Sequence, residues 1–392
     1  MIPLDELFFD SAATTNVSSE VLNAMLPYFN NKWQNPSSVY EPAQIIKQDI
    51  NNARKIIADS IMAKPDEIYF TSGGSEANCW AIEGFCKANT NPIVITTTIE
   101  HHSTMACVED YPHEFVPVDS EGFIVIEELE KKLKRYTNGI PSNILVSFIL
   151  GNNEIGTVQK YDEIIPLCKK YGATVHIDAV QYYPYSGLSA AQIPYDMMSV
   201  SGHKLHAPKG IGFLYVRIGT KIKPIIYGSQ ERQLRGGTEN VAYIMGLAEA
   251  VKQRWNSLNN DNLAKCRDYM IKQLKERFDC KLNGPEETSE DRAWERRLPN
   301  NVNVTFPYIY SAEQLIYLLG ENGIYCSAGS ACNEGNPDPS HVLTAIGLNT
   351  EDAGKTVRFS LPSIVTQKMI DNSIEVIDTC FKLLGVDPYV EV

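Results

Sequence analysis

The sequence predicts an α/β protein in which a mostly parallel sheet is covered by helices and is followed by a smaller second domain. Short apolar runs rich in β-branched residues alternate with helical patterns through the first two-thirds of the chain, and each run ends in polar or glycine residues. This alternation is typical of parallel strands joined by crossover helices. The runs lie at residues 67–71, 92–98, 143–150, 173–177, 197–201 and 212–216.

The chain changes character after residues 240–278, a long helical stretch rich in Ala, Leu, Lys and Arg. A polar loop at 283–291, one strand-like run at 301–306 and further helices follow it. A chain of 392 residues is also long for one compact unit. We therefore expect a change of domain within the long helical stretch.

Composition and charge exclude several classes of protein. Hydrophobic residues make up 43% of the chain and charged residues 21%, which is typical of a globular protein. The net charge of -13 argues against nucleic acid or an anionic membrane surface as the main partner. No apolar run is long enough to span a bilayer, and the N-terminal residues lack the basic region of a signal peptide. We expect a cytoplasmic protein with no nucleic-acid and no membrane partner.

The nine cysteines have irregular spacings and form no C-x-x-C pair, so neither a zinc ribbon nor a thioredoxin-type site is indicated, and no metal site is expected. In a reducing cytosol most of them should be small buried residues with unreactive thiols. The cysteines of helix-like stretches belong in this group: Cys79, Cys86, Cys168 and Cys380.

Polar clusters directly follow five of the predicted strands. Ligands of open parallel sheets bind outside the carboxyl ends of the strands, so five clusters at five such ends predict one shared site. The clusters are TSGGSEAN (71–78), EHHS (100–103), GNNEIG (151–156), DAVQ (178–181) and SGHK (201–204).

The first cluster is a candidate anion site. Gly74 and its neighbouring glycine let the backbone approach a ligand closely, and the helix expected from Ser75 onward would offer free N–H groups to a phosphate. An ordinary strand-to-helix turn with Ser75 as the N-cap is the alternative interpretation.

Asp178 and Lys204 are the candidate reactive pair. Asp178 ends an apolar strand, where a carboxylate needs a cation such as a protonated pyridine nitrogen. Lys204 lies between two apolar strands, and its amine could form an imine with an aldehyde, helped by a burial-lowered pKa. Ser201 and His203 could donate to a phosphate. The alternatives are an N-cap or ion pair for Asp178 and a solvent-exposed ammonium for Lys204.

Three further residues could contact the same ligand. His101 could stack on an aromatic ring or shuttle a proton, whereas the adjacent His102 is expected to be a bystander. Asn153 and Gln181 carry neutral amides that could hydrogen-bond a ring hydroxyl. His176, on the opposite side of the strand that ends at Asp178, is expected to be structural.

Residues 326–341 consist almost entirely of Gly, Ser, Ala, Asn, Asp and Pro, which is typical of an exposed loop. Cys332 on this loop could reach both a site and a partner, with a reactivity that depends on thiolate formation. Cys326, at a strand end, is expected to be buried. Arg358, within an apolar strand, could clamp a carboxylate or form a structural ion pair.

The motifs of this chain, taken in order, resemble those of the cysteine desulfurases in the class V aminotransferase family. They are TSGGSEAN, EHHS, NNEIG, HIDAVQ, SGHKLHAPKGIG, RGGTENV, SAGSAC and VRFS. The resemblance runs from Phe8 to Arg358. It implies the pyridoxal-phosphate transferase fold type I, with a large domain built on a mixed, mostly parallel seven-stranded sheet and a smaller α+β domain. The implied large cofactor-binding domain spans residues 15–255, and the small domain spans 1–14 and 256–392 and carries the cysteine loop.

The resemblance also implies roles for individual residues. Lys204 would hold pyridoxal 5'-phosphate as a Schiff base and later act as the base at the substrate α carbon. Cys332 would take the sulfur of L-cysteine as a persulfide, leaving L-alanine. Arg358 would bind the substrate carboxylate, and Asn153 would also contact the substrate. Asp178 would pair with the pyridine nitrogen of the cofactor, His101 would stack on its ring, and Asn153 and Gln181 would lie on its hydroxyl side. The implied phosphate contacts are Gly74, Ser75, Ser201 and His203. Thr238 would contact the phosphate of the other subunit, across a homodimer interface.

The expected activity supplies sulfur for iron–sulfur clusters, thiolated tRNA or another product, through a sulfur-acceptor or scaffold protein. A selenocysteine lyase, or another β-lyase or transaminase of class V, is an alternative. A non-catalytic scaffold that binds a sulfur acceptor is a further alternative, which the intact set of Lys204, Asp178 and Cys332 argues against.

Overall fold

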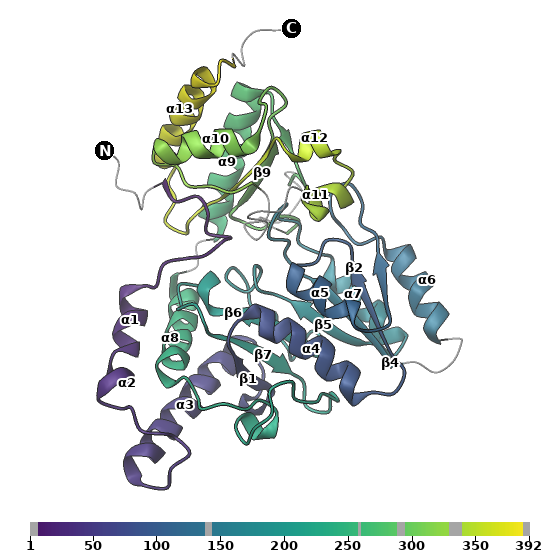
Figure 1. The fold of residues 1–392 in the computed structure, drawn as a ribbon, viewed down its shortest axis with the longest axis vertical. Helices are drawn as coiled ribbons and strands as arrows, with labels where there is room; N and C mark the ends of the chain where they lie inside the picture. Colours follow the sequence, from purple (N-terminus) through teal and green to yellow (C-terminus); the bar gives the residue numbers. More distant parts are fainter. Residues whose placement is uncertain (1–6, 138–142, 258–259, 288–294, 329–338, 387–392) are drawn as a thin grey trace.

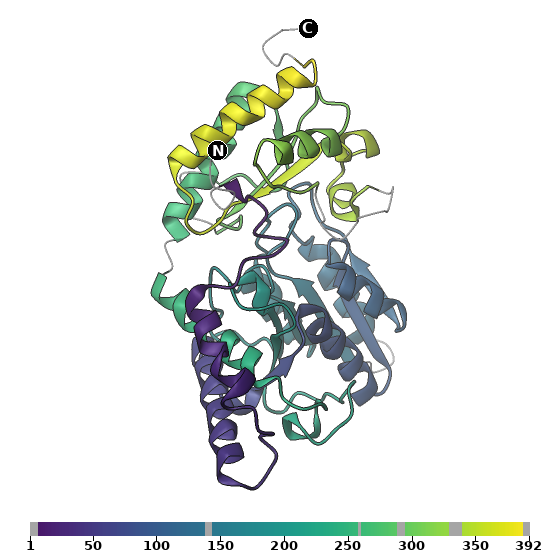
Figure 2. The same cartoon turned by 60° about the vertical axis from the view of Figure 1, so that its left-hand side comes forward.

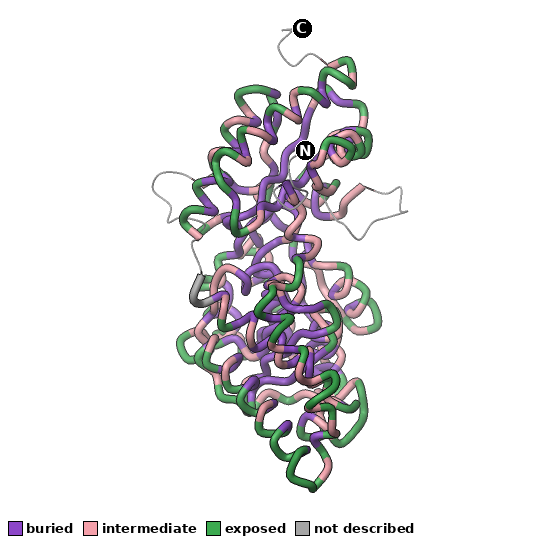
Figure 3. Tube along the Cα trace, turned by 90° about the vertical axis from the view of Figure 1, so that its left-hand side faces the viewer, coloured by how far each residue is buried: buried purple, intermediate pink, exposed green. Residues whose placement is uncertain are grey.

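The computed structural model describes residues 7–137, 143–257, 260–287, 295–328 and 339–386. Figure 1 shows a large body built around one sheet and, above it, a smaller body that holds most of the chain after residue 260. Buried residues run along the middle of both bodies in Figure 3, while exposed residues lie mainly on the outside. Among the described residues, no helix has the length and apolar character needed to cross a membrane.

The large sheet has seven strands in the order β1-β7-β6-β5-β4-β2-β3. β7 is antiparallel to both of its neighbours, and the other pairs are parallel. The predicted mixed, mostly parallel sheet is therefore confirmed. Its strands are β1 (Ile68–Thr71), β2 (Pro92–Thr97), β3 (His113–Val116), β4 (Asn143–Ile149), β5 (Thr174–Asp178), β6 (Met197–Ser201) and β7 (Gly212–Val216).

β3 was not anticipated by the apolar runs. It lies at the edge of the sheet and pairs only with β2. Three of its four residues are half-buried, so its sequence lacks the continuous apolar character of a central parallel strand.

Helices cover both faces of the large sheet because successive side chains of each strand point to opposite sides. Ile93 and Ile95 of β2 join the core that includes α3 and α8, whereas Val94 joins the core beneath α4. The helices of the large body are α1 (Ser19–Met25), α2 (Pro27–Asn30), α3 (Glu41–Ser60), α4 (Gly74–Ala88), α5 (His102–Glu109), α6 (Ile126–Thr137), α7 (Tyr161–Lys170) and α8 (Val241–Ser257), with the short 3-10 turn η3 (Gly202–Lys204).

The smaller body is built on an antiparallel sheet in the order β10-β9-β8. Figure 2 shows its long helices packed on one side of this sheet. The N-terminal residues Leu7 and Phe9 are buried in the same core. The elements after residue 260 are α9 (Asn260–Phe278), β8 (Lys281–Leu282), β9 (Asn301–Thr305), α10 (Ala312–Glu321), α11 (His341–Ala345), α12 (Thr350–Ala353), β10 (Thr356–Ser360) and α13 (Gln367–Leu383). The buried residues Val342 and Leu343 of α11 pack in the core of the large body.

The helical stretch predicted at 240–278 forms two helices, α8 and α9. α8 packs on α1 and α3 of the large body, whereas α9 packs on α13 and β9 of the smaller one. The assignment of 15–255 to a large domain, and of 1–14 with 256–392 to a small domain, stays a prediction.

The expectation for Cys79 is wrong. Cys79 of α4 is half-buried and forms a disulfide with Cys107 of α5, with 5.7 Å between the two Cα atoms. Cys326 is half-buried rather than buried. Cys86, Cys168 and Cys380 are buried free thiols, as expected. Burial raises the pKa of Cys86 and of Cys168 to about 12, which keeps both thiols protonated.

Candidate active site

The five polar clusters meet in one pocket at the carboxyl ends of the large sheet's parallel strands. The pocket has a volume of about 260 Å³, and every cluster contributes to its wall. Residues from the N-terminus and from the smaller body complete it. Its lining consists of Ala12, Ala13, Gly74, Ser75, Asn78, Glu100, His101, His102, Ser103, Ile149, Asn153, Glu154, Asp178, Val180, Gln181, Ser201, His203, Lys204, His341 and Arg358.

The N-terminus of α4 forms the anion-binding side of the pocket. The helix begins at Gly74 with Gly73 as its N-cap, so the predicted N-cap role of Ser75 is wrong, and Ser75 lies in the first turn. A Cβ atom on Gly74 would lie 2.7 Å from Cγ2 of Val180. Only glycine therefore lets the helix end approach the loop after β5 this closely, and its first N–H groups open towards the pocket.

Asp178 is held at the base of the pocket by two donors. Its Oδ2 accepts from Nδ2 of Asn78 at 2.7 Å, and its Oδ1 accepts from the backbone N–H of Val180 at 2.9 Å. The residue is 2% exposed and forms no ion pair within the described part of the chain. The side-chain Oδ1 of Asn78 also lacks a described hydrogen-bond partner. A buried carboxylate in this setting is suited to a cationic group of a ligand.

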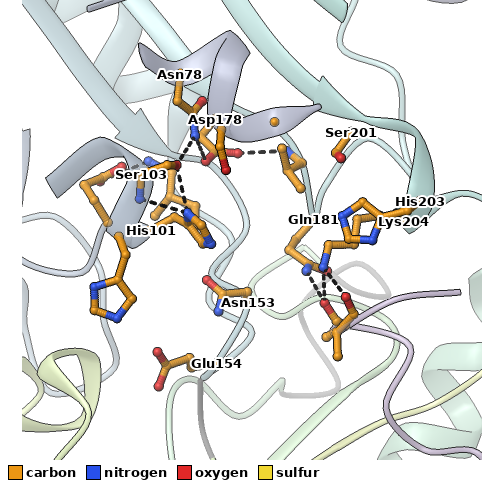
Figure 4. Close-up of a pocket in the computed structure, with 18 of the residues that line it drawn as sticks. Asn78, His101, Ser103, Asn153, Glu154, Asp178, Gln181, Ser201, His203 and Lys204 are labelled. Carbon is orange, nitrogen blue, oxygen red and sulfur yellow. Dashed lines mark hydrogen bonds between the residues drawn. The ribbon is translucent and has the colours of Figure 1, made fainter. Parts of the chain in front are cut away.

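A chain of hydrogen bonds connects Asp178 to His101 (Figure 4). Nδ2 of Asn78 also donates to Oγ of Ser103 at 3.1 Å, and that hydroxyl lies 2.8 Å from Nδ1 of His101. Nδ1 of His101 also caps α5 by accepting from the backbone N–H of Ser103. Burial lowers the pKa of His101, with a smaller contribution in the same direction from Lys204, while Asp178 opposes it. The ring is therefore neutral at physiological pH.

His102 is not a bystander, because it lines the pocket together with His341 of α11. The centroids of the two rings are 4.9 Å apart. Nε2 of His341 hydrogen-bonds the carbonyl oxygen of Glu100 at 2.8 Å. The two histidines thus connect the smaller body to the end of β2.

Lys204 faces the pocket from the side opposite His101 (Figure 4). Its Nζ donates to the carbonyl oxygens of Ala12 and Ala13 at 2.6 and 2.7 Å. Nε2 of Gln181 donates to the carbonyl of Ala12 at 2.8 Å. The N-terminal segment therefore orients both side chains, which the sequence pattern did not indicate.

Ser201 and His203 flank Lys204 in the pocket wall. Nδ1 of His203 lies 3.2 Å from the hydroxyl of Thr14. Burial, with a smaller effect of the Lys204 charge, lowers the pKa of His203 to about 4. His203 is consequently a neutral hydrogen-bonding group at neutral pH.

The structural role expected for His176 is confirmed, but its expected place on the opposite side of β5 from Asp178 is wrong, because residues two apart in a strand share a face. Its ring lies between the hydroxyls of Ser147 and Ser199, 2.8 Å from each, and the residue is fully buried outside the pocket. Burial lowers its pKa to about 3.

Arg358 of β10 enters the pocket from the smaller body. Its Nη2 forms an ion pair with Asp10 at 2.9 Å, and its Nη1 donates to the backbone oxygen of Asn153 at 3.0 Å. The hydroxyl of Ser327 also donates to Asp10. Nε of Arg358 has no described hydrogen-bond partner. The buried arginine is thus ion-paired and also lines the pocket, so a structural ion pair and a carboxylate clamp are compatible interpretations.

Two further predicted site residues are Cys332 and Thr238. Cys332 lies outside the residues that the structure describes. Thr238 is exposed and does not line the pocket of its own chain. On the C-terminal side of the cysteine segment, Oγ of Ser340 donates to the buried Glu154 at 2.5 Å.

Several pocket residues were given no role from the sequence. Asn78, Glu100, Ser103 and Glu154 stand inside the polar clusters, so their position in the chain was a usable signal. The carbonyl groups of Ala12 and Ala13 carried no such signal, because any residue offers the same backbone acceptor.

The fold and the pocket define an α/β enzyme whose lysine and buried aspartate face each other at the strand ends. The chain belongs to the aminotransferase class-V family, whose sequence model matches residues 7–372.

Curated relatives match nearly the whole chain. The cysteine desulfurase IscS of Methanosarcina thermophila is 41% identical over 97% of this chain and 94% of its own length. The cysteine desulfurase IscS of Clostridium botulinum is 39% identical over 96% of this chain. The resemblance deduced from the motifs is confirmed.

Solved structures share the fold. A NifS-like protein is 31% identical, with a TM-score of 0.86 over 96% of this chain and 100% of its own. SspA, solved in complex with cysteine, is 32% identical, with a TM-score of 0.76 over 92% of this chain and 99% of its own.

Proposed function

We propose that this chain is a cysteine desulfurase, which converts L-cysteine to L-alanine and holds the sulfur as a persulfide on Cys332. The observation that carries the proposal is the meeting of Lys204, Asp178 and His101 with Arg358 in a single pocket. The names of the relatives and the cysteine bound to SspA support the same substrate.

Pyridoxal phosphate suits the residues of the pocket. The contact that a Cβ on Gly74 would make with Val180 marks a cradle at a helix N-terminus, which is suited to a phosphate. Asp178 is a buried carboxylate without a described cation, which is suited to a pyridinium nitrogen. When bound, the cofactor supplies an electron sink for bond breaking at the substrate α carbon.

The proposed contacts follow from these positions. Lys204 attaches the cofactor, and Asp178 pairs with its ring nitrogen. His101 stacks on the ring. The remaining proposed contacts are Asn153 and Gln181 on the hydroxyl side and Gly74, Ser75, Ser201 and His203 at the phosphate.

The side chains of this protein then bind the substrate and move its protons. Arg358 binds the carboxylate of L-cysteine through its planar guanidinium group. The amine of Lys204 accepts the proton of the α carbon. The Cys332 thiolate attacks the substrate sulfur, the carbon–sulfur bond breaks, and the sulfur remains on Cys332 as a persulfide. Proton return to the three-carbon product gives L-alanine.

The proposal includes a homodimer, in which Thr238 of the partner subunit contacts the phosphate. Thr238 is exposed and does not line the pocket of its own chain, which supports this arrangement. A sulfur-acceptor or scaffold protein then receives the persulfide sulfur, in the cytoplasm.

Incubation of the purified protein with L-cysteine and a thiol reductant tests the function. Alanine and sulfide are expected in equal amounts, and absence of alanine would contradict the proposal. Lys204→Ala should lose both the activity and the visible absorption of the bound cofactor. Cys332→Ala should lose turnover of cysteine, whereas a transaminase would retain its activity in that variant.

A further inference from the structure

Glu100 is a buried carboxyl group beside the candidate active site, and the steps above do not use it. It is 1% exposed, it immediately precedes His101, and it lines the same pocket as Asp178. Its Oε1 accepts from the hydroxyl of Thr97 and from the backbone N–H of Ile149, the latter at 3.0 Å. Its Oε2 is buried and has no hydrogen-bond partner among the described residues.

This arrangement suits a carboxylic acid better than a carboxylate. Both available donors converge on one oxygen, so a negative charge would leave the other oxygen buried without a donor, which is costly. A proton on Oε2 removes that cost and turns the oxygen into a donor.

The charges around the pocket do not supply a counterion for Glu100. It forms no ion pair in the described part of the chain. The titratable groups that line the pocket from other elements are Asp178 of β5, His203 and Lys204 of η3, Glu154 after β4, His341 of α11 and Arg358 of β10. Those next to Glu100 in the chain are His101 and His102. The Arg358 guanidinium is paired with Asp10, and Lys204 donates to two backbone carbonyls.

Burial raises the pKa of Glu100 to about 8. The hydrogen bonds from Thr97 and Ile149 oppose this rise, and the negative charge of Asp178 adds to it. The acid form is therefore the one present at neutral pH.

Glu100 also connects three parts of the site. Its side chain joins the end of β2 to Ile149 at the end of β4, and its carbonyl oxygen accepts from His341 of α11. His101 is the next residue. A change in the position of Glu100 would therefore be passed through the backbone to the histidine proposed to stack on the cofactor.

We propose that Glu100 acts as a neutral carboxylic acid, a positioning residue that fixes His101 and spares the site a second anion beside Asp178. This inference rests on the proposed function. Without the second anion, Asp178 remains the acidic partner of a cationic ring, and the His101 ring stays neutral. Ionisation of Glu100 would favour protonation of His101 and compete with Asp178 for the same cation.

Thermal unfolding against pH tests the protonation state without any need for turnover. The cofactor-loaded full chain is compared with Glu100→Gln, whose amide reproduces the acceptor and donor of the neutral acid. An unfolded carboxyl ionises above a pKa of 4.5, whereas folded Glu100 keeps its proton up to about 8. The folded state therefore binds more protons in this window, and the wild type loses stability as the pH rises through it.

The expected result is a Tm advantage of Glu100→Gln over wild type that grows from pH 5 to pH 8 and then levels off. Glu109→Gln makes the same Glu-to-Gln change at an exposed position of α5 and should follow the wild-type profile. Parallel profiles of Glu100→Gln and wild type across the whole range would overturn the proposal.

Alanine formation against pH tests the positioning role. Glu100→Gln should keep kcat/KM at pH 7 within roughly threefold of wild type. The kcat/KM of wild type should decline above pH 8, where Glu100 ionises, and that of Glu100→Gln should not show this decline. Glu100→Ala leaves the donors of Thr97 and Ile149 unpaired, so its kcat/KM should fall by roughly tenfold or more. Equal losses in the Gln and Ala variants at pH 7 would show that a carboxylate is required, and would overturn the proposal. Absence of alanine from the wild type would contradict the desulfurase function alone, because the unfolding profiles would still determine the state of Glu100.

Discussion

Asn78 and Asp178, 100 positions apart in the chain, are joined by a 2.7 Å hydrogen bond from Nδ2 to Oδ2. The bond connects the first helix after β1 to the end of β5, and Ser103 extends it to His101. The carboxylate proposed to hold the cofactor nitrogen is thus oriented by an amide from a different strand-end cluster.

Asn78→Ala should weaken cofactor binding without unfolding the protein. A hydrogen bond to a charged group contributes about 1.5–3 kcal/mol, so the dissociation constant should rise roughly 10- to 100-fold. Titration of the apoprotein with pyridoxal phosphate, followed by absorbance, measures the change. Asn89→Ala, near the end of the same helix, removes an amide that bonds only a helix carbonyl and should bind normally. An unchanged constant in Asn78→Ala would contradict the orienting role.

Gly74→Ala should disturb the phosphate cradle through a steric clash. The new methyl group would lie 2.7 Å from Cγ2 of Val180, and overpacking of this kind costs about 1–3 kcal/mol. Cofactor affinity should fall by a corresponding factor. The double variant Gly74→Ala with Val180→Ala removes the contacted methyl group and should recover most of the affinity. Failure of this rescue would mean that the glycine matters for a reason other than space.

The disulfide between Cys79 and Cys107 should stabilise the packing of α4 against α5. Closing a loop of 28 residues contributes about 3.6 kcal/mol in the chain-entropy description. Cys79→Ser should therefore lower the Tm under non-reducing conditions, measured by calorimetry. With a strong dithiol reductant present, wild type and variant should unfold at nearly the same temperature. Alkylation of both cysteines in the unreduced protein, detected by mass spectrometry, would contradict the crosslink.

His176 should contribute to acid sensitivity. Its pKa is lowered to about 3 by burial, so between pH 6.5 and 3 the unfolded state binds the additional proton. Stability from this group is complete above pH 6.5 and is lost as the pH falls towards 3, by up to about 5 kcal/mol. His176→Gln keeps a polar partner for Ser147 and Ser199 but does not titrate, so its stability should depend less steeply on pH in this window. Denaturant unfolding at several pH values measures this slope, and equal slopes would contradict the assignment.

Arg358→Lys should raise the KM for L-cysteine more than it lowers kcat. An ammonium group cannot reproduce the planar pair of donors that matches a carboxylate. We expect an increase of roughly tenfold or more in KM, the effect of losing one charge-assisted hydrogen bond. Steady-state alanine formation gives both constants. Lys355→Arg in the loop before β10 is a control for general effects of basic substitutions in this region, and should leave both constants unchanged. A fall in kcat alone would argue against substrate binding by Arg358.

Much of the site could be predicted because parallel strands deliver their carboxyl ends to one edge of a sheet. The strand-end motifs could be assigned to a common pocket without knowing the order of the strands in the sheet. They hold Gly74, His101, Asn153, Asp178 and Lys204. The structural role of His176 was predicted correctly, but alternation along β5 places it on the same face as Asp178, because the two residues are two positions apart. Local periodicity and composition carry this information, and these are properties of the sequence itself.

Tertiary structure alone decided the partners of these residues. Asp10 meets Arg358 across 348 positions, Lys204 meets the carbonyl of Ala12 across 192, and Cys79 faces Cys107 from a neighbouring helix. Such pairs depend on how each helix is rotated and how the two bodies pack, and many distant residues determine both. The polar clusters in the sequence indicated where a ligand binds. The packing determined which groups orient Asp178, Lys204 and Arg358. It also left one oxygen of Glu100 without a donor among the described residues.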